Sequence, residues 1–420
     1  MSVRRLPVRP DLDQLRHQAR DLLRAIRAGD PAALAELREH HPDTIDPASV
    51  QLADAQLVLA RSYQARSWTR LVQAVRLAGA IWQDDLDAVR DLVTANPHLI
   101  REHVLIRGDS NWGPPMTYAA NLGRDRIIRL LHGLGATDLH SAVDRAALQG
   151  KVATAKMLYD MAGRPSLDDG ALGSPAYTLS TEGTALLLSL GAPVRSGAGS
   201  PVEVVLQTDA RNPAAKHAIL EMYVHHGLEL PDTPAMALHR GRIDLLEKHL
   251  ARDPGLLGRT FIHREIYPAE MGCGDPLDAT VGTPLGGSTL LHMCVDYDEL
   301  EIARWLLDRG MDVNARAAVG KSGFGGHTAL FNTVVSQPNF WMNYRRRGPF
   351  VAPFAELLLE RGADPNVRAS LWKRLHPGHG DPARHEYRDV TARSWGRRFH
   401  APIFVSEPAL QRIEEAGGVE

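Results

Sequence analysis

One unit of sequence occurs more than once in this chain, and such repetition constrains a fold more than composition does. The clearest copy opens with TLLH at residues 289–292 and closes with GMDVN at residues 310–314. A second copy opens with TAL at residues 328–330 and closes with GADPN at residues 362–366. A unit this short cannot bury its own apolar face, so successive copies are expected to stack into one continuous core.

The pattern resembles the ankyrin repeat, a unit of about 33 residues that opens with T-P-L-H. Eleven of its characteristic positions match in the clearest copy, where Leu290 replaces the usual proline. The resemblance is strong over residues 288–315, continues over 326–335 and 354–368, and is loose elsewhere from about residue 76. It implies two antiparallel helices per unit, and binding of proteins through the inner helices and loops of the concave face.

We therefore predict an all-α, ankyrin-repeat solenoid of helix–turn–helix units. Residues 1–75 match the repeat poorly but carry leucine and alanine at helical spacing, which predicts an N-terminal helical cap over the first repeat. Residues 76–258 are expected to form degenerate repeats, and residues 259–420 repeats with long loop insertions. The N-terminal region also resembles that of bacterial ankyrin-repeat proteins with a helical extension, and this resemblance implies no particular reaction.

Charge and composition exclude several classes of protein. The 420 residues include 48 Lys and Arg against 50 Asp and Glu, a formal net charge of −2, so no global field attracts nucleic acid or lipid. Two cysteines cannot form a disulfide framework, and no apolar run approaches the roughly 20 residues of a membrane helix. The first residues show no signal-peptide pattern. We expect a cytoplasmic monomer that does not cross a membrane and needs no cofactor.

The C-terminal half breaks the repeat period. The openings at Thr289 and Thr328 are 39 residues apart, against about 33 for one unit. The next opening, at Thr391, follows 63 residues after Thr328, and we assign long loops to residues 259–287, 336–353 and 369–390. Long loops are uncommon in compact proteins unless they carry function, and insertions in a repeat array gather on one face. These loops are therefore expected to form the recognition surface.

Arginine and aromatic residues are concentrated near these loops. Residues 341–400 carry twelve Arg and Lys against six Asp and Glu, interleaved with tryptophan and tyrosine. Arginine together with aromatic side chains is typical of interfaces. This excess of basic residues is too small to indicate a nucleic-acid-binding surface, so nucleic acid is not an expected partner.

Two hypotheses follow from this composition. In the first, the chain is a non-enzymatic scaffold that binds a protein partner, for instance through an acidic segment of that partner. In the second, the loops fold over the concave face and form a pocket that binds or transforms a small anionic molecule. Candidate binding residues for one or the other are His263, Glu265, Tyr267, His292, Asp296, His327, Asn332, Asn339, Trp341, Tyr344, Arg345, Arg346, Arg347, Trp372 and Arg374.

A metal site is a weaker hypothesis. His376, His379, Asp381 and His385 lie within ten residues of one another, and imidazole and carboxylate groups bind zinc. Their spacing matches no established zinc motif. At His292 the ankyrin resemblance instead implies a structural imidazole bonded to the turn backbone.

Signatures of catalysis are missing from the sequence. It contains no G-x-S-x-G, no phosphate-binding G-x-x-x-x-G-K-[ST], no H-E-x-x-H and no G-x-G-x-x-G. Cys294 occupies an apolar inner-helix position and is expected to be a small core residue. Cys273 lies in a glycine-flanked loop near His263 and Glu265, where we expect it to be exposed and the better placed thiol for reactivity. The sequence thus favours a binding protein over an enzyme.

Overall fold

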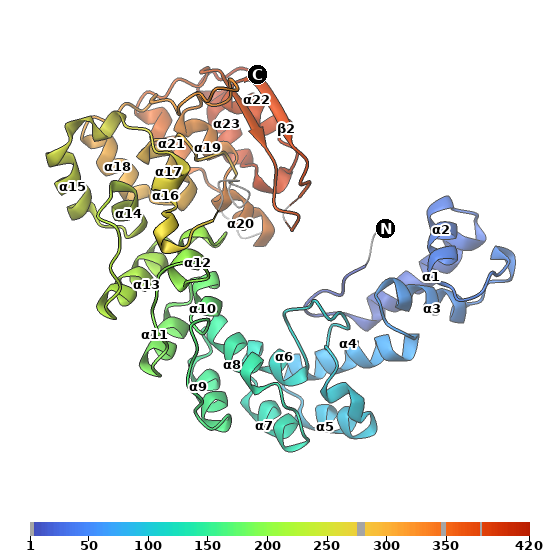
Figure 1. The fold of residues 1–420 in the computed structure, drawn as a ribbon. Helices are drawn as coiled ribbons and strands as arrows, with labels where there is room; N and C mark the ends of the chain where they lie inside the picture. Colours follow the sequence, from blue (N-terminus) through green and yellow to red (C-terminus); the bar gives the residue numbers. More distant parts are fainter. Residues whose placement is uncertain (1–3, 275–281, 346–349, 379) are drawn as a thin grey trace. The chain divides into compact units, whose positions relative to one another are not determined.

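The computed structural model describes residues 4–274, 282–345, 350–378 and 380–420. The chain divides into two compact units, Met1–Ser166 and Leu167–Glu420 (Figure 1). Both units are mostly helical in the described residues. Among those residues we find no helix with both the length and the apolar character needed to cross a membrane.

The first unit consists of helices that pack against one another in succession. Its elements are α1 (Leu12–Arg27), α2 (Pro31–His40), η1 (Pro47–Ser49), α3 (Leu52–Ser62), α4 (Trp68–Gln83), α5 (Leu86–Ala95), η2 (Pro97–Ile100), α6 (Pro115–Leu122), α7 (Asp125–Gly133), α8 (Leu139–Leu148) and α9 (Val152–Met161). Helix α1 packs on α3, α4 on α6, and α6 on α8. Residue 75 lies inside α4, so the helix that would end the predicted cap continues to Gln83.

Aspartates fix where several of these helices begin. Asp11, Asp30 and Asp85 each accept a hydrogen bond of 2.8–3.0 Å from the backbone N–H three residues later. These bonds satisfy backbone donors that the first turn of a helix cannot satisfy. The predicted helical stripe of α1 is confirmed, since Leu15 and Leu22 are buried among its apolar residues.

The second unit contains the clearest repeats. Its helices are α10 (Gly173–Thr178), α11 (Thr181–Ser189), α12 (Pro201–Gln207), α13 (Pro213–His225), α14 (Pro234–His239), α15 (Ile243–Arg252), η3 (Pro254–Gly258), α16 (His263–Ile266), η4 (Ala269–Met271), α17 (Leu290–Tyr297), α18 (Leu300–Asp308), α19 (Ala329–Val334), α20 (Gln337–Arg345), α21 (Pro353–Glu360), α22 (Ala392–Arg398), η5 (Pro402–Phe404) and α23 (Glu407–Glu415). The inner helices α14, α17, α19 and α22 pack in series, and so do the outer helices α18, α21 and α23. This is the stacking that repeated units require.

Two predicted loops are in fact regular structure. Residues 369–390 were expected as a loop in an all-α fold, but they contain the antiparallel strands β1 (Ala369–Lys373) and β2 (His385–Val390). The reason is the alternation along β1, where Ala369, Leu371 and Lys373 are buried and the residues between them are half-buried. The predicted 336–353 loop likewise contains the helix α20.

Candidate functional site

His292 holds the opening turn of the clearest repeat. Its Nδ1 accepts hydrogen bonds from the Thr289 hydroxyl (2.9 Å) and backbone N–H (3.3 Å), and its Nε2–H donates to the His327 carbonyl at 3.1 Å. Complete burial lowers the pKa of His292 to about 4, so the imidazole is neutral at physiological pH. The structural role implied by the resemblance agrees with these contacts.

His327 continues the same arrangement into the next repeat. Its Nε2–H donates to the Pro284 carbonyl at 3.1 Å, and its ring stands perpendicular to that of His292 at 5.2 Å between centres. Burial lowers the pKa of His327 to about 3. Asn332, on α19, is also fully buried. These side chains therefore build the interior between repeats.

Asp296 belongs to a buried polar network on the inner side of α17. Its carboxylate forms a 2.8 Å ion pair with Arg211, whose Nε–H also donates to the Asp296 carbonyl at 2.8 Å. The Arg211 guanidinium lies 4.7 Å from the centre of the Tyr297 ring, and the Tyr297 hydroxyl donates to that of Tyr267 at 2.5 Å. Lys216 lies over the same ring at 3.9 Å, and burial lowers the pKa of its ammonium to about 8.

The short helix α16 begins at His263 and carries Glu265 two residues later. The Glu265 carboxylate accepts a 2.9 Å hydrogen bond from the Ile262 N–H and pairs with Arg259. The expectation for Cys273 was wrong: the thiol is buried, and this burial raises its pKa to about 12. A thiol held in its protonated form is a poor nucleophile.

Helix α20 is fastened at several points. The Asn339 amide donates to the Thr333 carbonyl at 3.0 Å, and that of Asn343 to the Val405 carbonyl at 2.8 Å. The indole N–H of Trp341 donates to a backbone carbonyl, that of Asp209. The side chains of Arg345, Arg346 and Arg347 lie outside the described residues.

Two cavities flank α20 and share Met342. One, of about 430 Å³, is lined by Tyr177, Arg211 and Trp341 among others. The other, of about 260 Å³, is lined by Asn339 and residues 351–355 among others. At the end of α20, Tyr344 is 64% exposed and stacks on Phe340 at 5.7 Å between ring centres. The helix thus presents aromatic side chains beside open depressions.

The β-hairpin carries the remaining candidates. Trp372 lines a third cavity, and Arg374 is half-buried. The imidazole of His385 bonds to the Asp381 carboxylate at 2.9 Å, and its ring stacks on that of His400 at 3.9 Å.

The predicted zinc site is not assembled in the described part of the chain. There the structure brings no three histidine, cysteine or carboxylate side chains together for a metal ion. His376 is exposed, and His379 lies outside the described residues.

Comparison with known proteins agrees with the repeat geometry. The family model described as "Ankyrin repeat" matches residues 286–318, which contain α17 and α18. The chain therefore contains an ankyrin repeat at these residues. The matched repeat is therefore the copy that the hydrogen bonds of His292 and His327 stabilise.

Two solved ankyrin repeat domains are similar to it. The human ASB11 domain aligns with 73% of this chain and 99% of its own, at 14% sequence identity and a TM-score of 0.29. The domain of Bcl-3, titled a unique member of the IkappaB protein family, aligns with 81% of this chain and 97% of its own, at 15% identity and a TM-score of 0.21. None of the curated proteins compared with the chain matches it.

The structure does not bring the predicted pocket residues together. His327 lines the cavity beside β1, whereas Glu265 lines another, of about 410 Å³, beside α15 and α16. His292, Asp296 and Asn332 are fully buried. The sequence analysis missed Arg211 and Lys216, because their partners lie more than 80 residues away and no local pattern marks them.

Proposed function

We propose that the protein is a non-enzymatic scaffold that binds a protein partner through α20 and the surface around it. The observation that carries this proposal is the gathering of exposed apolar side chains there. Tyr344, at the end of α20, is 64% exposed. Tyr177 (52% exposed) and Val351 (49% exposed) line the two cavities beside that helix, and Phe350 (52% exposed) precedes Val351 in the chain. Exposed apolar groups that cluster in this way mark interaction sites.

The polar contacts of the same region suit an interface. Arg211 and Trp341 line the larger cavity beside α20, and arginine and tryptophan are enriched among residues that dominate binding energy. The basic excess of residues 341–400 favours a partner segment with acidic side chains and an apolar anchor. The anchor would occupy one of the two cavities that share Met342.

The ionisable candidates support a binding role over a catalytic one. His292 and Asp296 are buried and hold neighbouring groups in place, so they do not face a substrate. Burial keeps the Cys273 thiol protonated. We further propose that the protein is cytoplasmic and monomeric and requires no cofactor. Light scattering on the purified chain tests its monomeric state.

Comparative affinity capture tests the proposed surface. The bait is the full chain, as wild type, as Tyr344→Ala/Phe350→Ala, and as the control Leu134→Ala/Val152→Ala, which removes two exposed apolar side chains from the first unit. A partner enriched by wild type and control should be lost about tenfold or more by the α20 variant. Equal enrichment by all three baits would contradict the proposal, and circular dichroism confirms that each bait is folded.

A further inference from the structure

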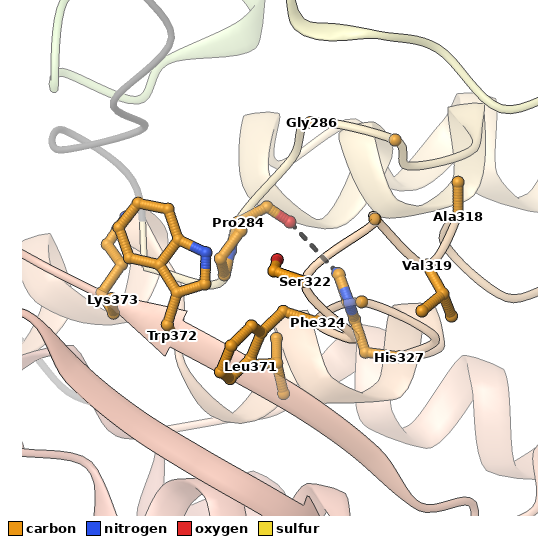
Figure 2. A pocket seen from close by; sticks show the side chains of 13 residues that line it. Pro284, Gly286, Ala318, Val319, Ser322, Phe324, His327, Leu371, Trp372 and Lys373 are labelled. Atoms are coloured by element: carbon orange, nitrogen blue, oxygen red, sulfur yellow. Dashed lines mark hydrogen bonds between the residues drawn. The ribbon is translucent and has the colours of Figure 1, made fainter.

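A cavity of about 330 Å³ lies apart from α20, between the β-hairpin and the loop that follows α18. Three segments form its walls, as Figure 2 shows. The first wall consists of Pro284, Gly286 and Gly287. The second wall, in the loop that follows α18, consists of Ala318, Val319, Gly320, Ser322, Phe324, Gly325 and His327. The third wall, in β1, consists of Leu371, Trp372 and Lys373. Its volume lies within the roughly 300–1,000 Å³ of small-molecule sites.

Hydrogen bonds between the segments hold the cavity open. The Gly287 carbonyl accepts from the Ala318 N–H at 2.8 Å, which joins the first wall to the second. The Gly325 N–H donates to the Ser370 carbonyl at 2.7 Å, which joins the second wall to β1. His327 adds its bond to Pro284 (Figure 2). Because these bonds join the three segments directly to one another, the site is organised before binding, which lowers the entropy cost of binding.

The aromatic lining of the cavity favours a flat ligand. Phe324 and Trp372 supply aromatic walls, with Leu371 beside them (Figure 2). The loop wall needs glycine: Gly325 has a φ of +122°, and a Cβ there would lie 2.1 Å from the Ala318 carbonyl oxygen. Aromatic rings stack on planar groups and gain more than from burial alone.

Arginines cover the same aromatic rings from outside the cavity. The Arg384 guanidinium lies 4.5 Å from the centre of the Trp372 ring, and that of Arg388 lies 4.5 Å from the centre of the Phe324 ring. Neither arginine lines the cavity itself, but each lies against an aromatic ring that does. Both pair with the one carboxylate of Glu386, each at 2.9 Å. Two cations sharing one anion leave an excess positive charge beside the aromatic wall of the cavity.

We propose that this cavity binds a planar aromatic carboxylate about the size of naphthoate. The ring system lies against Phe324 and Trp372, and the carboxylate lies toward Arg384 and Arg388. This site is separate from the α20 surface and goes beyond the proposed scaffold function. The ligand is a free small molecule, because the walls enclose a volume suited to two fused rings.

Ligand-observed NMR titrations of the full chain test the site with 2-naphthoate and its neutral analogue naphthalene-2-carboxamide. We expect 2-naphthoate to bind about two- to fivefold more tightly, the range for a solvent-exposed charge pair. Arg384→Gln/Arg388→Gln should reduce its affinity to that of the amide, whereas Arg412→Gln, which removes an exposed arginine elsewhere, should not. Equal affinity of the two probes for wild type would overturn the proposal.

A variant that fills the cavity tests whether the probe binds there. Val319 is 63% exposed, so Val319→Trp should fill the cavity without disturbing the core and should abolish binding of 2-naphthoate. Val152→Trp in the first unit is the matched control and should bind like wild type. Unchanged binding by Val319→Trp, or no binding by wild type, would overturn the proposal. Tyr344→Ala/Phe350→Ala should still bind the probe, so failure here is distinguishable from failure of the scaffold function.

Discussion

The side-chain oxygen of Asn314 accepts a 2.8 Å hydrogen bond from the backbone N–H of Asp364, one repeat further along the chain. The same amide donates to the Gly362 carbonyl at 3.2 Å. Asn366 makes the corresponding pair of bonds, at 2.9 and 3.2 Å, with the backbone of residues 417–419. In these two repeats an asparagine therefore joins one turn to the next, in addition to the apolar contact between helices.

Asn314→Ala should lower the free energy of unfolding by about 1–2 kcal/mol, since it removes two hydrogen bonds that join neighbouring repeats. Urea denaturation followed by circular dichroism measures the loss. Gln411→Ala is the control, because its amide bonds to Glu415 within a single helix, and it should change stability by less than about 0.5 kcal/mol. Equal effects of the two substitutions would show that the hydrogen bonds of Asn314 do not stabilise the stacking of repeats.

The buried ion pair between Arg211 and Asp296 should be sensitive to loss of one partner. Arg211→Ala leaves the carboxylate buried without its cation, and we expect a loss of about 3–5 kcal/mol. Arg211→Met/Asp296→Leu removes both charges and should recover much of that loss in the same denaturation experiment. The exposed pair of Arg412 and Glu356 gives the comparison: Arg412→Ala should cost at most about 1 kcal/mol.

The repeat and the role of His292 could be predicted from the sequence because both depend on local patterns. The opening threonine and the imidazole three residues later determine their own contacts, and the apolar spacing determines the buried face of the helix. The packing of α17 on α19 follows from the repeat, because the apolar face of each helix is buried only when the neighbouring repeat covers it.

The candidate site could be predicted only in outline. Strand β1 has five residues and pairs with a strand that begins twelve residues after it ends, so no hairpin turn signal links them. The proline at residue 338, in the first turn of α20, could have indicated that helix. Pairing of Arg211 with Asp296 depends on contacts across 85 residues, which periodicity does not reveal.

Acid should destabilise the protein through its buried histidines. Burial lowers the pKa of His292 to about 4 and that of His327 to about 3, so neither takes up a proton at pH 5 in the folded state. In the unfolded state each is protonated below its ordinary pKa of about 6.5. Their contribution to stability is therefore complete above pH 6.5 and is lost as the pH falls toward 4, at about 1.4 kcal/mol per pH unit for each histidine.

Denaturation at several pH values between 6.5 and 4.5 measures that slope. His292→Gln should reduce it by about 1.4 kcal/mol per pH unit, because one titrating group is removed. Asn314→Ala, which removes no titrating group, should leave the slope unchanged. A slope that His292→Gln does not alter would mean that His292 is not neutral and buried under these conditions.

Attachment of α20 should depend on Asn343, whose amide donates to the carbonyls of Ile403 at 2.9 Å and Val405 at 2.8 Å. Asn343→Ala leaves both acceptors without this donor, at a cost of about 1–2 kcal/mol. The loss falls mainly on α20, because the stacked helices α17, α19 and α22 do not use this contact. Amide hydrogen exchange over residues 337–345 should accelerate by about tenfold, with little change in the amides of α17. Acceleration spread equally over both helices would show that α20 is an integral part of the stack.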